Sequence, residues 1–382
     1  MSVTAETADR DSRHAALTLS FALPGDVLLY LLLPLYADSF GISLAEAGVL
    51  LAANRLVRIV GYGTVAHLYA ARGARWACLI ACVGSIVSTL AYGLVSGFWL
   101  LLVARLMWGL SFAVLNIANQ ALPTSALEGA AARSGRARSI VAMGPMLSLV
   151  VGALLAETLG PRAVFILLAL AALAAPVFAA RLPETTQPLN RAGPRISVPE
   201  TISIWSFSMG FALDGIFVFG LSLIAAQSLP QGAVIAAGAA MALRYVSEIV
   251  LSTPGGLLAQ RIGPRRLLIV LSLATSASLA FIGVHSLLVW GAIIVTVILR
   301  ALLQPLPGPV VAMAYPGPER VQALARQATW RDIGAGTGPL AAGVLMPLLP
   351  ALAVFAGAGG LLALSTALLM RERATPRDVT GT

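Results

Sequence analysis

The stretch Phe21-Ala22-Leu23-Pro24-Gly25 has a near copy 190 positions later, at Phe211-Ala212-Leu213-Asp214-Gly215. With no gap, the same offset places the loop Gly73-Ala74-Arg75 on Gly263-Pro264-Arg265. Apolar sequences often match by chance, but here one register also holds through glycine and arginine positions. The pattern therefore predicts a chain made of two duplicated halves.

Composition places both halves in a membrane. Apolar residues make up 58% of the chain and charged residues 11%, whereas ~25% of an ordinary soluble domain is charged. The sequence therefore predicts an all-α membrane protein with twelve transmembrane helices in two pseudo-symmetric six-helix bundles. The twelve apolar spans are 16–36, 44–66, 76–95, 98–120, 137–159, 162–180, 201–225, 232–259, 267–285, 287–312, 327–349 and 351–370.

Polar segments divide the chain into five parts. We expect cytoplasmic tails at residues 1–15 and 371–382, around bundles at residues 16–180 and 201–370. The segment between the bundles, residues 181–200, holds four prolines and three arginines and is predicted to be a cytoplasmic connector.

Arginine supplies all 25 basic side chains, and most of them fall on one side of the predicted spans. By the positive-inside rule, both termini are expected in the cytoplasm of a bacterial cell, with the protein in its inner membrane. A net charge of +9 spread over such short loops does not indicate nucleic-acid binding. The other side carries only Arg162, whereas the arginine-rich side carries Arg10, Arg13, Arg72, Arg75, Arg133, Arg136, Arg138, Arg181, Arg191, Arg195, Arg261, Arg265, Arg266, Arg320, Arg326, Arg371, Arg373 and Arg377.

Two loops carry copies of one motif. The later loop, Gly256 to Arg266, reads Gly-Leu-Leu-Ala-Gln-Arg-Ile-Gly-Pro-Arg-Arg. It is a good match to a pattern of the type Gly-x-x-x-Asp-Arg-x-Gly-Arg-Arg, with Gln260 in place of the acid and Pro264 between Gly263 and the two arginines. The earlier loop keeps Gly73 and Arg75 but has Ala70 in place of the acid.

Three helices carry further motifs. The fourth span contains Arg105-Leu106-Met107-Trp108-Gly109, an Arg-x-x-x-Gly pattern. The fifth contains Gly144-Pro145, with Gly152 seven residues after the proline, and an offset of 194 places Gly144-Pro145 on Gly338-Pro339 in the eleventh. Small residues let helix backbones approach closely, and proline bends a membrane helix.

Through these motifs, the chain resembles the major facilitator superfamily over nearly its whole length. The motif pattern is most similar to that of its proton-coupled efflux members. The resemblance implies a gating or motif role for Gly73, Arg75, Gly109, Gly144, Pro145, Gly256, Arg261, Gly263, Arg265, Gly338 and Pro339. In the family, the motif acid contacts a helix terminus on the cytoplasmic side. Both loops lack that acid here, so the resemblance provides no residue for this contact.

Ionisable residues deep in the spans are the candidates for chemistry, because a charge near the bilayer centre costs about 3 kcal/mol. Five arginines and three acids lie at such depth, which favours an anionic or zwitterionic solute. They are Asp26, Arg55, Arg58, Arg105, Asp214, Arg244, Glu248 and Arg300.

Within this set, Asp26 is the leading candidate for proton coupling, and the family's architecture implies Arg105, Arg55 and Arg58 as its nearest partners. Arg244 and Glu248 are four residues apart, so a purely structural pair along one helix is the alternative for them. Neutral substrate contacts are predicted at Asn54, Asn116 and Gln304, whereas Asp332, beside Arg331, is interpreted as a helix cap.

The remaining patterns exclude other energy sources. The chain has no phosphate-binding Gly-x-x-x-x-Gly-Lys loop, so ATP hydrolysis is not expected. Its histidines, His14, His67 and His285, are far apart, and Cys78 and Cys82 lie in an apolar span, so neither a metal site nor a cofactor is predicted.

The sequence thus predicts a transporter and not an enzyme: a monomer in the lipid bilayer that exports a small organic solute by alternating access, driven by the proton gradient. A proton-coupled uptake symporter for an organic anion is the first alternative. A non-transporting receptor or a membrane-embedded enzyme is the alternative of another class.

Overall fold

A computed structural model describes residues 4–184, 199–221, 224, 233–282 and 287–372, and in these residues the regular structure is entirely helical. The prediction of an all-α protein is confirmed. Predicted features at residues 185–198 of the connector, at the span ends 222–223, 225–232 and 283–286, and at residues 373–382 lie outside the described residues, as do Arg191, Arg195, His285, Arg373 and Arg377.

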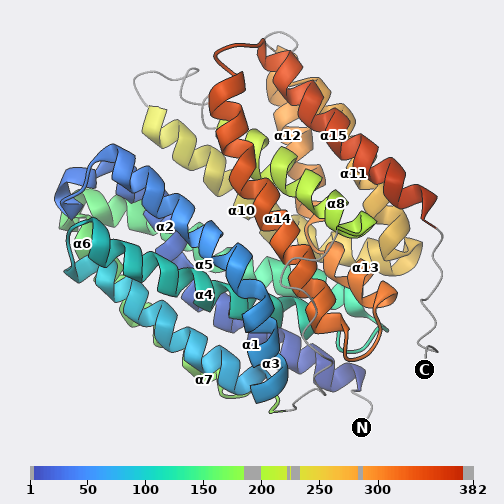
Figure 1. Cartoon of the computed structure of the whole chain (residues 1–382), viewed down its shortest axis with the longest axis horizontal. Helices are drawn as coiled ribbons and strands as arrows, with labels where there is room; N and C mark the ends of the chain where they lie inside the picture. Colours follow the sequence, from blue (N-terminus) through green and yellow to red (C-terminus); the bar gives the residue numbers. More distant parts are fainter. Residues whose placement is uncertain (1–3, 185–198, 222–223, 225–232, 283–286, 373–382) are drawn as a thin grey trace.

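The first half contains helices α1 (Ala5–Ala22), α2 (Pro24–Leu35), α3 (Leu44–Leu94), α4 (Phe98–Ala121), α5 (Ala130–Leu159), α6 (Pro161–Ala172) and α7 (Ala175–Ala179), with a short 3-10 turn η1 (Ala37–Phe40). The second half contains α8 (Thr201–Met209), a π-helical segment η2 (Gly210–Phe217), α10 (Ala233–Ile262), α11 (Pro264–Ala280), α12 (Leu287–Leu303), α13 (Pro307–Ala314), α14 (Arg320–Leu345) and α15 (Ala351–Arg371). Figure 1 shows the two halves as bundles that lie side by side, with the start of α1 and the end of α15 on one side of the molecule. We call this side the terminal face.

Proline and glycine set the helix boundaries. Pro24 occupies the first turn of α2, where its missing N–H is not needed, and so divides the first predicted span into α1 and α2. Gly73 (φ 81°) bends α3, and Gly263 (φ 102°), at the equivalent position, separates α10 from α11. Only glycine adopts such positive φ values without strain, so the motif glycine changes the chain direction in both halves.

The described residues include eight helical segments that are long and apolar enough to cross a membrane. One of them, α3, has 51 residues. At about 1.5 Å per residue it is more than twice as long as a ~30 Å hydrocarbon core, so it accommodates two crossings joined at Gly73. The total of twelve spans stays a prediction.

Several helices begin earlier than hydropathy predicts. Residues 5–15, assigned to a tail, form the first turns of α1, where Thr4 caps the helix and Asp11 is buried. Similarly, α5 begins at Ala130 instead of 137, and α14 at Arg320 instead of 327. Hydropathy windows stop at charged residues, whereas a helix with buried polar positions continues past them.

The duplication is visible in the packing. A Cβ atom on Gly144 of α5 would lie 1.9 Å from the Ser20 carbonyl oxygen of α1, and one on Gly338 of α14 would lie 2.6 Å from the Phe211 carbonyl oxygen of η2. In each half, therefore, the fifth helix packs against the backbone of the first through the glycine of the predicted Gly-Pro motif.

The two halves meet along α5 with α10 and along α3 with α14. A Cβ on Gly135 of α5 would lie 2.4 Å from the Ser252 carbonyl oxygen, and one on Gly256 of α10 would lie 2.4 Å from that of Ala131. Ser139 also contacts Thr253, with 3.0 Å between their hydroxyls. The start of α5 and the end of α10 thus pack backbone to backbone, which closes the space between the halves toward the terminal face.

Candidate functional site

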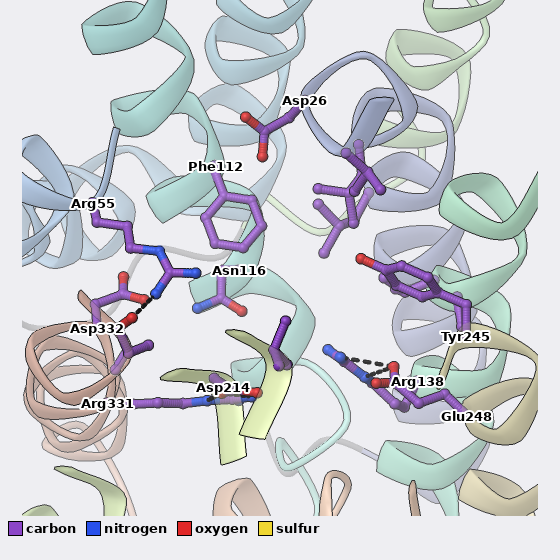
Figure 2. A pocket seen from close by; sticks show the side chains of 18 of the residues that line it. Asp26, Arg55, Phe112, Asn116, Arg138, Asp214, Tyr245, Glu248, Arg331 and Asp332 are labelled. Carbon is purple, nitrogen blue, oxygen red and sulfur yellow. Dashed lines mark hydrogen bonds and ion pairs between the residues drawn. The ribbon is translucent and has the colours of Figure 1, made fainter. Parts of the chain in front are cut away.

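A cavity of about 250 Å³ lies between the halves. Helices from both bundles line it, and Figure 2 shows Arg55 and Asp332 on one side of it and Tyr245 and Glu248 on the other. Its charged lining residues are Asp26, Arg55, Arg58, Arg138, Asp214, Arg244, Glu248, Arg300, Arg331 and Asp332. Six arginines face four acids, an excess of two positive charges.

In the first half, Asp26 lies in the first turn of α2 and forms an ion pair with Arg105 of α4. The Asn54 side-chain amide donates to the same carboxylate at 3.1 Å. Arg105 is fully buried behind Asp26, and its Nε donates to the Leu50 carbonyl oxygen at 3.1 Å. Of the three partners expected for Asp26, Arg105 forms the ion pair, whereas Arg55 bonds the Ala335 carbonyl oxygen and Arg58 pairs with Asp332.

In the second half, Arg300 of α12 bridges two acids. It lies 2.5 Å from Asp214 and 2.6 Å from Glu248. Arg331 of α14 is a second partner of Asp214 at 2.8 Å and also donates to the Gln304 side chain at 2.9 Å. Asp214 lies in the π-helical segment η2, a type of helix that often marks functional sites.

The two clusters are related by the duplication. Asp26 and Asp214 come from the first transmembrane helix of each half, whereas Arg105 and Arg300, 195 positions apart, come from the fourth. In each half, an acid on the first helix therefore pairs with an arginine on the fourth.

Two further ion pairs join the halves to each other. Arg58 of α3 lies 3.0 Å from Asp332 of α14, which also accepts a hydrogen bond from the Tyr62 hydroxyl at 3.1 Å. Arg138 of α5 lies 2.8 Å from Glu248 of α10. In both pairs the first half contributes the arginine and the second half the acid.

Two arginines of the cavity have no carboxylate partner in the described part of the chain. Arg55 donates to the Ala335 carbonyl oxygen across the interface. Arg244 lies over the Tyr245 ring, 4.7 Å from its centroid, and its buried Nε has no hydrogen-bond partner. The alternative of a pair between Arg244 and Glu248 is not what the structure contains, because Glu248 bonds Arg138 and Arg300 instead.

Seven of the eight predicted deep charges line the cavity, and Arg105 lies behind Asp26. Among the predicted neutral contacts, Asn116 lines the cavity and donates to the Tyr62 hydroxyl at 3.2 Å. Asn54 instead holds Asp26, and Gln304 lies in a smaller pocket of about 50 Å³ that shares Arg331 with the main cavity.

Three charged residues of the cavity were not predicted as site residues. The interpretation of Asp332 as a helix cap is wrong, because it lies in the interior of α14, which begins at Arg320. Arg331 and Arg138 were assigned to helix ends and loops, yet both form ion pairs in the cavity. The repeat contained the missing signal, since an offset of 194 places Arg138 on Asp332.

The motif arginines act within their own halves. Arg75 donates to the Leu182 carbonyl oxygen at 2.8 Å and pairs with Glu184 after the sixth helix. At the equivalent position, Arg265 donates to the Leu369 carbonyl oxygen at 2.6 Å at the end of α15. Each motif arginine thus anchors the last helix of its bundle, while Arg261 is exposed at the end of α10.

Gly109 of α4 has a packing role. A Cβ atom there would lie 2.8 Å from the Asn54 carbonyl oxygen of α3. The Arg-x-x-x-Gly motif of α4 therefore supplies both Arg105, the partner of Asp26, and Gly109, which lets α3 approach α4 closely.

Comparisons with known proteins agree with this architecture. The crystal structure of the human organic anion transporter MFSD10 (TETRAN) is similar to this chain, with a TM-score of 0.77 and 18% sequence identity over 95% of this chain and 99% of that one. No curated protein sequence matches the chain. A family model described as Major Facilitator Superfamily matches residues 15–231 and 203–381, which together span nearly the whole sequence. The chain belongs to the major facilitator superfamily and is a multi-pass membrane transporter.

Proposed function

We propose that this transporter exports a small organic anion or zwitterion in exchange for protons, by alternating access. The observation that carries the proposal is the cavity itself: it lies between two duplicated halves, and its lining has an excess of two positive charges. The name of the similar human structure, an organic anion transporter, points to the same class of solute. A cavity of about 250 Å³ suits a small molecule.

The ion pairs Arg58 to Asp332 and Arg138 to Glu248 form the gate in this proposal. They join the halves on two sides of the cavity, so rocking of the halves to open the terminal face must break both. An anionic solute competes with Asp332 and Glu248 for these arginines, and its binding therefore favours that movement.

Asp26 is the proposed proton carrier. Asp26 pairs with Arg105, which also belongs to the first half. Among the described residues, its ion pair therefore does not cross between the halves. Protonation of Asp26 neutralises the carboxylate and leaves Arg105 without its counter-charge, so the charge of this cluster depends on whether Asp26 holds a proton.

We also propose that the protein lies in a bacterial inner membrane as a monomer, uses no cofactor, and has both termini in the cytoplasm. The many arginines of the loops on the terminal face support this orientation. In that orientation, the contact between α5 and α10 closes the cavity toward the cytoplasm.

The test uses membrane vesicles of both orientations, with liposomes that contain only this protein as the reference. Labelled organic acids should accumulate in acidified everted vesicles, and their addition should release protons from them. Accumulation only in right-side-out vesicles would instead indicate the uptake symporter. Failure to accumulate any solute in either preparation would favour a non-transporting protein.

A further inference from the structure

Arg244 is the arginine of the cavity with no hydrogen-bond acceptor in the described part of the chain. Its guanidinium lies 4.7 Å from the centroid of the Tyr245 ring, and its Nε is buried without a partner. The nearest acid along its helix, Glu248, is already bonded to Arg138 and Arg300. No carboxylate among the described cavity residues therefore forms an ion pair with Arg244.

Arg55 is in a similar position in the other half. It lines the cavity from α3, and its one bond in the described structure goes to the carbonyl oxygen of Ala335. A carbonyl dipole orients the guanidinium without neutralising its charge. Figure 2 shows Arg55 and Tyr245, the neighbour of Arg244, on opposite sides of the pocket.

Among the described residues that line the cavity, no acid is left to compensate these two charges. Each of the four acids that line the cavity is already held by at least one other arginine: Asp26 by Arg105, Asp332 by Arg58, Glu248 by Arg138 and Arg300, and Asp214 by Arg300 and Arg331. With Arg105 counted as the partner of Asp26, seven arginines face four acids, and Arg55 and Arg244 account for two of the three excess positive charges. The third belongs to the cluster in which Arg138, Arg300 and Arg331 share Glu248 and Asp214. A charge at this depth is unfavourable without a partner.

We propose that the cavity binds an organic dianion with an acidic group at each end, one held by Arg55 and the other by Arg244. Each guanidinium can hold a carboxylate through two hydrogen bonds. Because Arg55 belongs to the first half and Arg244 to the second, the ligand connects the two bundles and neutralises both unpaired charges. This inference rests on the proposed transport of an anion. It adds that the cavity binds dicarboxylates more tightly than monocarboxylates.

The test measures binding to the purified full-length protein in nanodiscs by isothermal titration calorimetry. The probes are pairs of equal chain length: succinate with butyrate, glutarate with pentanoate, and adipate with hexanoate. At least one dicarboxylate should bind about ten-fold more tightly than its monocarboxylate. Arg55→Gln and Arg244→Gln should each reduce that dicarboxylate's affinity to the level of the monocarboxylate.

The matched control is Arg72→Gln, which removes an exposed arginine from the loop side of α3 and should preserve the difference within each pair. Size-exclusion chromatography and a thermal melt establish that each variant is folded. Equal affinities within all three pairs would overturn the inference, and so would variants that lose the monocarboxylate as strongly as the dicarboxylate. Export of a monoanion in the vesicle test would meanwhile leave the proposed transport intact.

Discussion

Arg58 and Glu248 occupy equivalent positions in the two halves, 190 residues apart, and each forms an ion pair across the interface. Their partners, Asp332 and Arg138, are also equivalent, at an offset of 194. The duplication has thus produced two symmetric contacts in which the first half always carries the arginine. Opposite charges face each other in both ion pairs, so both pairs stabilise the arrangement in which the halves are in contact toward the terminal face.

The ion pair between Arg58 of α3 and Asp332 of α14 should tolerate an exchange of its two charges. Arg58→Asp alone places two acids together and should lower transport about ten-fold or more, because removing one partner of a buried pair costs about 3–5 kcal/mol. Arg58→Asp combined with Asp332→Arg should restore much of the activity. Transport by purified protein in liposomes measures both, and a double variant no better than the single one would show that the two residues do not act as a pair.

Arg300 should contribute strongly to stability, since it bridges Asp214 and Glu248 while almost fully buried. Arg300→Gln leaves both buried acids short of a counter-charge and should destabilise the protein by about 3 kcal/mol or more. Arg331→Gln is the comparison, because the Arg331 side chain is 25% exposed and Asp214 keeps Arg300. Thermal unfolding in detergent should show the larger loss of melting temperature for Arg300→Gln, and the reverse order would contradict the bridging role.

The contact of α5 with α1 should not accept a methyl group. In Gly144→Ala the new Cβ would lie 1.9 Å from the Ser20 carbonyl oxygen, so the two helices must separate and both stability and transport should fall. Gly343→Ala is the matched control, because a Cβ there has no atom within 4 Å. Equal melting temperatures and transport rates for the two variants would contradict the close approach of these helices.

Much of the architecture could be predicted from periodicity and composition, because both depend on local sequence. The duplicated turns at Gly73 and Gly263 and the packing glycines Gly144 and Gly338 are present as expected. Helix starts were less predictable: α1 includes residues of the expected tail, since Asp11 is buried by tertiary packing that hydropathy does not register.

The partners of the deep charges could be predicted only in part. The family resemblance implied Arg105, Arg55 and Arg58 as partners of Asp26, and among the described residues only Arg105 forms an ion pair with it. By contrast, Glu248 bonds Arg138 of the other half instead of Arg244 on its own helix, because the close packing of α5 and α10 brings Arg138 within 2.8 Å. Sequence spacing describes contacts along one helix, whereas the contacts of Asp332 and Arg138 depend on how the two halves meet.

The most direct test of the account compares driven transport with exchange in Asp26→Asn. This change keeps the shape of the side chain, removes its charge and its ability to bind a proton, and leaves an amide beside Arg105. Transport driven by a pH gradient into liposomes should fall about ten-fold or more, whereas exchange of labelled for unlabelled solute without a gradient should continue. Asp38→Asn, which alters an exposed acid in η1, should change neither. Undiminished gradient-driven transport in Asp26→Asn would contradict the role of Asp26 as the proton carrier.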